Sequence, residues 1–342
     1  MNNKNDNDNA IEVKDLKKSY KTYESLSGER VFLASLRRRN KIKYALKGVS
    51  FTVKKGEIVA LLGENGSGKS TLIKLLTGIL HPDSGTAKVL GYVPWKERVA
   101  LAQRMGVVLG AHTQLWWNLP AIDSFNYMRY MYGIDEKEFH KRLDYFTDVL
   151  NLKNVYKRAV RQLSLGERMK CNFAASLLHM PELVFLDEPT IGVDLPSSFA
   201  LRDTLLAMRK KYGITFIIAT HIIDDVKILS ERVVILDEGR KVFDGPKSKV
   251  GKMFGDLKQV EIYFNDMDGV DTSDYGTVVE KKTNYVRLEI PGGVIKNRRF
   301  ASLLASSKVL DYNISEPDFG YILHKFYSKL EASRGVSRRR FE

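Results

Sequence analysis

The amino-acid sequence predicts an α/β fold built on a mostly parallel sheet. Short apolar runs bounded by turn residues are typical of strands that are buried on both faces. Such runs occur at residues 58–62, 183–186, 215–219 and 233–236, and a helical stretch at about 197–212 lies between the second run and the third. The order strand, crossover helix, strand is the pattern of a parallel sheet.

Other segments predict the parts around this sheet. Residues 50–53 alternate like a half-buried strand, and residues 123–132, 136–150 and 166–180 are expected as helices. Beyond Asp244-Gly245-Pro246 the pattern changes to short alternating runs, at 260–264 and 286–290, with a helical stretch at the end. A small α+β domain is therefore expected after the boundary.

Length, charge and cysteine content limit the class of protein. The chain has 342 residues, 44% of them apolar, which suits about two domains and excludes global disorder. Its formal charge of +14 favours polyanionic partners, namely nucleic acid, acidic lipid headgroups or phosphates. The single cysteine, Cys171, excludes a disulfide framework and is expected as a buried helix residue, not a nucleophile. No apolar run is long enough for a membrane-spanning helix.

The expected domain organisation has four parts. Residues 1–10 form a disordered leader without the features of a signal peptide, and 11–245 form the main domain with a basic insertion at 21–43. That insertion is either a solvated loop or a patch that faces anionic lipid headgroups. Residues 247–333 form the accessory domain, and 334–342 are a solvated basic tail.

A glycine-rich loop follows the first apolar strand. Residues 63–71, Gly-Glu-Asn-Gly-Ser-Gly-Lys-Ser-Thr, match the pattern GxxxxGK[ST] and lie between a strand and a helix, as the phosphate-binding function requires. Glycines let consecutive N–H groups point at phosphate oxygens, and the helix adds its positive end. Lys69 would reach the β- and γ-phosphates, and the Ser70 hydroxyl would bind Mg²⁺. The expected nucleotide ligands are Gly63, Asn65, Gly66, Gly68, Lys69, Ser70 and Thr71.

Two carboxylates end the apolar strand at 183–186. Because open α/β sheets bind ligands at the carboxyl ends of their strands, Asp187 is placed to hold Mg²⁺. Glu188, one residue later, can point the other way and take a proton from attacking water.

Two further polar residues are placed to contact phosphate. Ser164 begins a helix with Gly166 two residues on, which offers a hydroxyl and N–H donors to an anion; in isolation the same pattern is an ordinary helix cap. His221 follows the strand at 215–219, expected beside the Asp187 strand, where it could contact a γ-phosphate.

Together these residues resemble the nucleotide-binding subunit of an ABC (ATP-binding cassette) transporter over about residues 11–245. The resemblance implies a P-loop NTPase cassette with a mostly parallel core sheet, an antiparallel β subdomain and a helical subdomain. It also implies ATP and Mg²⁺ as cofactors. Lys69, Glu188 and His221 would then be catalytic, and Ser70 and Asp187 would hold the metal.

The resemblance assigns further roles and shows two departures. Leu163–Glu167 is similar to the family signature, which grips ATP held by the opposite protomer, with Leu165 and Glu167 where Gly and Gln are commonest. Tyr20 lies where the family stacks an aromatic ring on adenine. Ala111 occupies the position of a family glutamine that senses magnesium and the membrane partner, and Gln114 is the candidate substitute.

The resemblance also implies partners. Two chains, identical or different, would form an ATP-dependent dimer that drives a separately encoded permease from the cytoplasmic face of the membrane. Residues 114–120 and 316–319 resemble segments of exporter cassettes, so export is expected. Trp116 and Trp117 would either pack in the core or face the permease. The cargo stays open, because its recognition would belong to the permease.

Two other functions compete with transport. A soluble ABC-type ATPase acting on the ribosome or on nucleic acid would suit the +14 charge, but such factors usually carry two cassettes or a long coiled coil. A kinase or GTPase would share only the phosphate loop, and Ser164 and Glu188 argue against both. A nucleic-acid partner is therefore not the expectation.

Overall fold

The computed structural model describes residues 8–23, 40–110, 113–252, 257–267 and 269–333. The chain divides into two compact units, Met1–Gly245 and Pro246–Glu342. Most of the predicted leader, the middle of the basic insertion with its arginines, Ala111 and the basic tail lie outside the described residues.

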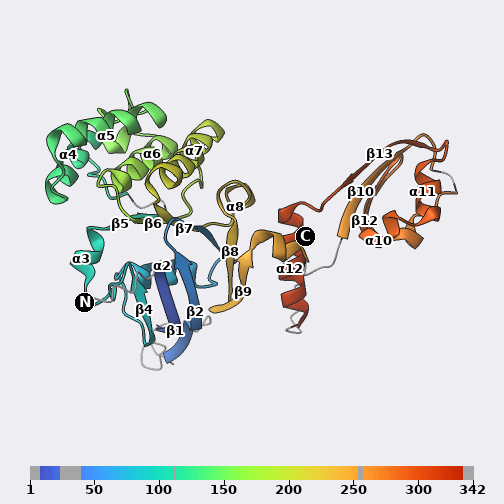
Figure 1. The fold of residues 1–342 in the computed structure, drawn as a ribbon, viewed down its shortest axis with the longest axis horizontal. Helices are drawn as coiled ribbons and strands as arrows, with labels where there is room; N and C mark the ends of the chain where they lie inside the picture. The colour runs from blue at the N-terminus through green and yellow to red at the C-terminus, as the bar shows by residue number, and fades with distance from the viewer. Residues whose placement is uncertain (1–7, 24–39, 111–112, 253–256, 268, 334–342) are drawn as a thin grey trace, which may run out of the picture. The chain divides into compact units, whose positions relative to one another are not determined.

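A six-stranded sheet in the order β5-β6-β7-β3-β8-β9 forms the centre of the first unit (Figure 1). The pairs β5–β6, β6–β7, β3–β7 and β3–β8 are parallel, which confirms the predicted fold class. The strands are β3 (Ile58–Leu62), β5 (Met105–Leu109), β6 (Leu183–Asp187), β7 (Thr215–Ala219), β8 (Arg232–Asp237) and β9 (Arg240–Pro246).

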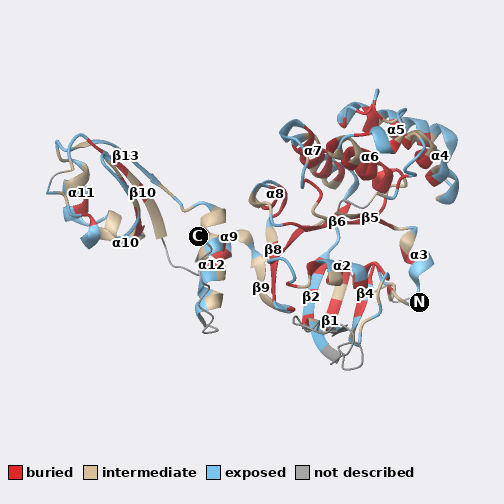
Figure 2. Ribbon diagram, turned by 180° about the vertical axis from the view of Figure 1, so that it is seen from behind, coloured by how far each residue is buried: buried red, intermediate tan, exposed pale blue. Residues whose placement is uncertain are grey.

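Alternate residues of the central strands enter two different cores, which is why these strands are apolar without interruption. In β6, Val184 and Leu186 pack in a core shared with α4–α7, whereas Leu183 and Phe185 pack in a core shared with α2 and the antiparallel sheet. Figure 2 shows the buried residues concentrated along these strands and on the inner faces of the helices. The helices are α2 (Lys69–Leu76), α3 (Arg98–Ala102), α4 (Ala121–Met131), α5 (Glu136–Val149), α6 (Leu165–Leu177), α7 (Leu195–Tyr212) and α8 (Ile223–Leu229), with a 3₁₀ turn at Val160–Gln162.

The antiparallel sheet has the order β2-β1-β4 and corrects two sequence expectations. Its strands are β1 (Asn9–Tyr23), β2 (Asn40–Lys54) and β4 (Ser84–Val89). Strand β1 begins at Asn9, inside the predicted leader, and Ala10 is buried in the core. Both ends of the predicted insertion also belong to strands, since pairing between β1 and β2 continues to Tyr23 and Asn40.

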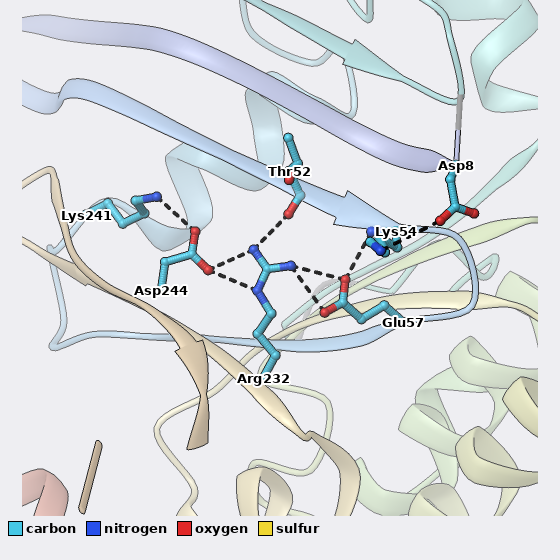
Figure 3. Close-up of polar contacts among 7 residues, drawn as sticks. All are labelled: Asp8, Thr52, Lys54, Glu57, Arg232, Lys241 and Asp244. Atoms are coloured by element: carbon cyan, nitrogen blue, oxygen red, sulfur yellow. Dashed lines mark hydrogen bonds and ion pairs between the residues drawn. The ribbon is translucent and has the colours of Figure 1, made fainter. Parts of the chain in front are cut away.

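An arginine cluster ties this antiparallel sheet to β8 and β9 (Figure 3). Arg232 donates through Nε and Nη2 to one oxygen of Asp244, at 2.9 and 2.7 Å, and through Nη1 to both oxygens of Glu57 at 3.2 Å. Its Nη2 also donates to the Thr52 carbonyl at 3.0 Å, and Lys241 binds the other oxygen of Asp244. Five hydrogen-bond contacts of one guanidinium thus join three segments of the cassette.

The second unit contains an antiparallel sheet in the order β11-β12-β10-β13. Phe300 of α11 is fully buried against its apolar face, among residues such as Val260, Ile262 and Leu288. The elements are α9 (Lys247–Lys252), β10 (Leu257–Phe264), a 3₁₀ turn (Ser273–Tyr275), β11 (Thr277–Lys282), β12 (Tyr285–Pro291), α10 (Gly292–Ile295), α11 (Arg298–Leu304), β13 (Val309–Ser315) and α12 (Phe319–Ser333). Across the described ranges, no helix is both long and apolar enough to cross a membrane.

Candidate functional site

The glycine-rich loop connects β3 to α2 at the carboxyl end of the parallel sheet. Gly68 has a φ of 110°, and a Cβ there would lie 2.6 Å from the Ala45 carbonyl oxygen and 2.8 Å from Leu46 Cδ2. Only glycine therefore allows β2 to approach the loop this closely. The Ser67 hydroxyl is buried inside the loop and has no hydrogen-bond partner among the described residues. A buried polar group of this kind needs a ligand or a water.

Lys69 folds back over the loop. Its ammonium donates to the carbonyl oxygens of Gly63, at 2.6 Å, and Glu64, at 3.2 Å. Burial lowers the pKa of Lys69, and the nearby carboxylates of Glu188 and Asp187 oppose that shift. The loop hydroxyl and this cation together fit a phosphate, because both can donate hydrogen bonds to its oxygens.

The two predicted carboxylates lie where β6 ends. Asp187 is the last residue of β6 and pairs with Ala219 of β7, as expected for neighbouring parallel strands. Glu188 follows with a φ of 53°, the left-handed region that is uncommon for a residue other than glycine. Its backbone N–H donates to the Ala219 carbonyl at 2.7 Å, which holds the turn against β7.

His221 meets Glu188. The imidazole Nδ1 lies 2.8 Å from Glu188 Oε1, and the backbone N–H of His221 is 3.4 Å from Oε2. The Glu188 side chain is 18% exposed and that of His221 is 53% exposed, so solvent or a ligand can reach the pair. The prediction that the strand before His221 lies beside the Asp187 strand is confirmed. The structure thus brings together four of the predicted residues: Lys69, Asp187, Glu188 and His221.

The segment that resembles the family signature begins α6. Ser164 is its N-cap: the Glu167 N–H donates to Ser164 Oγ at 3.2 Å, and the Ser164 N–H donates to Glu167 Oε2 at 2.9 Å. This reciprocal capping box satisfies two backbone donors at the helix start. Arg158 also pairs with the Glu167 carboxylate. Glutamate in place of the commonest glutamine therefore has a local structural role.

The other departure, Leu165, has a packing role. A Cβ on Gly192 would lie 2.5 Å from Leu165 Cδ2, so the leucine covers the loop at 192–194. A Cβ on Gly166 would lie 3.0 Å from the Asp194 carboxylate. Asp194 in turn caps α7 by accepting from the Ser197 N–H at 2.9 Å. The signature segment and the loop that follows Glu188 are therefore one packed surface.

Tyr20 lies on the strand pair that approaches the glycine-rich loop. It pairs with Lys43 of β2, two residues before Ala45, and it is 37% exposed. The Lys18 ammonium lies 5.8 Å from the centre of its ring. One face of the strand pair thus offers an aromatic ring and a positive charge.

Gln114 points to α6. Its side-chain amide donates to the Asn172 carbonyl at 3.2 Å, and its backbone N–H donates to Asn172 Oδ1 at 3.3 Å. Gln114 and Asn172 line a cavity of about 330 Å³ with mainly apolar walls. The other lining residues are Thr77, Ile79, Arg98, Ala102, Met105, Val107, Val108, Leu109 and Thr113.

The paired tryptophans follow this cavity-lining segment and are not core residues. Trp116 is 43% exposed and Trp117 49% exposed. Trp116 packs against Tyr127 with ring centres 5.0 Å apart, and the Arg168 guanidinium lies 5.3 Å from the Trp117 ring. Cys171 is fully buried within α6, which confirms the predicted buried helix position, and burial raises the pKa of its thiol to about 12.

Sequence reasoning missed a buried polar cluster behind the site. Asp225 of α8 contacts Arg202 of α7 and the hydroxyls of Thr190 and Thr220. One feature of the sequence could have indicated this cluster. Asp225 lies four residues after His221 on a short helix, on the same face as the buried Val226 and Leu229. A carboxylate on a buried helix face requires partners, but the sequence does not say which.

Comparisons with known proteins agree with this geometry. A family model described as ABC transporter matches residues 46–191. The ABC transporter ATP-binding protein NatA of Bacillus subtilis is 30% identical over 207 residues, which cover 60% of this chain and 84% of NatA. The linearmycin resistance ATP-binding protein LnrL of the same organism is 34% identical over 213 residues, or 62% of this chain and 68% of LnrL. A solved ATP-binding subunit of an ABC transporter superposes with a TM-score of 0.60 at 26% identity, covering 72% of this chain and 93% of that structure.

Proposed function

The chain belongs to the ATP-binding subunits of ABC transporters, an ATPase family, and on that premise we propose that it uses ATP hydrolysis to drive export through a separate membrane permease. One observation carries the catalytic part of the proposal. Lys69, Asp187, Glu188 and His221 come from three different strand ends and converge at one edge of the sheet. Open α/β sheets bind their ligands at this edge.

Different residues at and near the loop would bind the phosphates, the adenine and the metal. Backbone N–H groups of residues 63–68, the Ser67 hydroxyl and the Lys69 ammonium would bind the phosphates, and Tyr20 would stack on the adenine. Ser70 and Asp187 supply the hydroxyl and carboxylate oxygens that Mg²⁺ prefers. When bound there, the metal would offset the negative charge of the phosphates.

Glu188 and His221 act on the reacting groups. The Glu188 carboxylate would orient a water molecule and accept its proton as the water attacks the γ-phosphate. His221 holds that carboxylate at 2.8 Å and is exposed enough to reach a phosphate oxygen itself. The two residues therefore function as a pair.

A second protomer completes each site in this proposal. In this chain Ser164 is exposed where α6 begins, and the buried Gly166 lies behind it beside Asp194. A two-fold dimer would place this helix start on the nucleotide of the opposite chain, so that two ATP molecules lie between two copies or between this chain and a related one. Loss of the γ-phosphate would then release the dimer.

The permease would contact the face that carries the cavity beside Gln114. Apolar cavity walls and two half-exposed tryptophans are the kind of surface that binds a partner helix. Attachment there would place the chain on the cytoplasmic face of the membrane, and the basic residues of the β1–β2 region would suit anionic headgroups. The similarity to a linearmycin resistance protein supports export.

Replacement of the proposed general base tests the catalytic assignment. Glu188→Gln should bind ATP normally and hydrolyse it at least ~100-fold more slowly, the scale of a lost general base. Phosphate release measures turnover, and calorimetry with ATP and Mg²⁺ measures affinity. Normal turnover in this variant would show that Glu188 is not the base. Lys69→Ala is the control for binding, because it removes the cation that contacts the phosphates.

A further inference from the structure

A buried ion pair joins α7 to α8 behind the candidate site. Arg202 donates through Nε to Asp225 Oδ1 at 2.8 Å, and its Nη2 lies 2.7 Å from the same oxygen. The Asp225 side chain is fully buried and that of Arg202 is 7% exposed. Removing one partner of such a pair leaves an uncompensated buried charge, so the folded state is strongly destabilised when either residue is lost.

The other oxygen of Asp225 reaches two loops of the site. Thr190 Oγ1 donates to Asp225 Oδ2 at 2.5 Å, and Thr220 Oγ1 lies 3.4 Å from the same atom. Thr190 lies two residues after Glu188, and Thr220 lies one residue before His221. One carboxylate therefore anchors both loops that supply the Glu188–His221 pair.

The anchoring explains how Glu188 keeps an unusual backbone conformation. A residue other than glycine at a φ of 53° costs free energy and persists only where its surroundings hold it. Three contacts do so here: the Glu188 N–H to Ala219, the carboxylate to His221, and the hydroxyl of Thr190 to Asp225. Both partners of the last contact are buried.

We infer that Asp225 is a positioning residue for hydrolysis: through Thr190 and Thr220 it fixes Glu188 and His221 relative to each other. The inference rests on the proposed role of Glu188 as general base. Arg202 holds the carboxylate in turn, and it lies on α7, whose N-cap residue Asp194 lies beside Gly166 of the signature segment. The cluster thus also links the pair to the surface where a second protomer would bind.

Thr190 offers the sharpest test, because valine has nearly the shape of threonine but lacks the hydroxyl. Thr190→Val should lower kcat for ATP about ten-fold, since small displacements of catalytic groups are costly. The KM and the Kd for ATP with Mg²⁺ should change less than about two-fold, because the Thr190 hydroxyl is buried against Asp225 and does not belong to the phosphate loop. Thr190→Ser keeps the donor and should restore kcat.

A matched control separates positioning from stability. Asp244→Asn removes a charge from the Arg232 cluster of Figure 3, in the same unit but outside the candidate site. It should lower the Tm at least as much as Thr190→Val and leave kcat unchanged. If Thr190→Val lowered the Tm but kept normal kcat, or if Thr190→Ser failed to recover activity, Asp225 would only stabilise the fold.

The same assay distinguishes failure of this inference from failure of the proposed function. Slow hydrolysis by Glu188→Gln together with normal kcat in Thr190→Val and in the Thr190→Val/Thr220→Val double variant would overturn the inference alone. Normal hydrolysis by Glu188→Gln would overturn both, because Asp225 would then have no general base to position.

Discussion

At the scale of single residues, burial determines the protonation of His179. His179 follows α6, where it stacks on Tyr132 at 4.0 Å and contacts the Met105 carbonyl at 3.0 Å through Nε2. Burial lowers the pKa of His179 to about 4, so the folded chain keeps this ring neutral. The unfolded chain protonates it below about pH 6.5. The free energy of unfolding therefore falls as the pH decreases from 6.5 to 4.

His179→Gln should remove this part of the pH dependence. Between pH 7 and pH 5 the wild-type chain should lose about 2 kcal/mol more of its free energy of unfolding than the variant does, from the lowered pKa. Urea unfolding at the two pH values measures the difference. His140→Gln, at an exposed histidine of α5, should behave like the wild type. An identical pH dependence in His179→Gln would show that His179 titrates normally in the folded chain.

At the scale of elements, the start of α6 combines a helix cap with the segment that resembles the family signature. The capping box explains why Glu167 replaces the commonest glutamine without loss of the helix start, since either residue can accept from the Ser164 N–H. The added negative charge pairs with Arg158, which is nearly half exposed. Ion pairs this accessible contribute little to stability.

Glu167→Gln should therefore be almost neutral. We expect ATP turnover within about two-fold of the wild type and a loss of less than about 1 kcal/mol of unfolding free energy, from the exposed ion pair. Glu167→Ala also removes the cap and should destabilise the chain by about 1 kcal/mol. Thermal unfolding and phosphate release measure the two effects. A collapse of turnover in Glu167→Gln would mean that this carboxylate acts on the nucleotide directly.

At the scale of the whole molecule, the candidate nucleotide site and the proposed partner surface are made by different residues of the cassette. The glycine-rich loop and the Glu188–His221 pair lie at the carboxyl ends of the strands. The apolar cavity beside Gln114 lies between α3, β5 and α6. We therefore expect that substitutions can disrupt hydrolysis and the proposed partner binding independently.

Affinity purification from detergent-solubilised membranes tests the partner. The wild-type chain should retain a hydrophobic protein of about six helices, whereas the double variant Trp116→Ser/Trp117→Ser should lose it and keep its ATP turnover. Glu188→Gln, with an intact partner surface, should still retain the protein. Recovery of ribosomal subunits in place of a membrane protein would favour the alternative of a soluble ATPase acting on the ribosome.

The sequence by itself determined the fold class, the phosphate loop and the carboxylate strand. Each depends on neighbouring residues: β3 and β6 are continuous apolar runs because both faces are covered, and Gly68 is required because β2 approaches its backbone. Requirements of this kind can be recognised in the sequence, because they fix the residue types at consecutive positions. The ends of the basic insertion were misjudged, because polar strands that pair with each other at the surface carry little apolar periodicity.

Only the tertiary structure decided which polar groups meet. The contacts of Glu188 with His221, and of Asp225 with Arg202 and Thr190, join residues more than twenty positions apart. A carboxylate can be paired by any cation or hydroxyl that the packing brings to it, so no spacing along the chain predicts the partner. The sequence therefore indicates which residues are candidates for the site, whereas the alignment of these candidate residues depends on how α7 and α8 pack against the sheet.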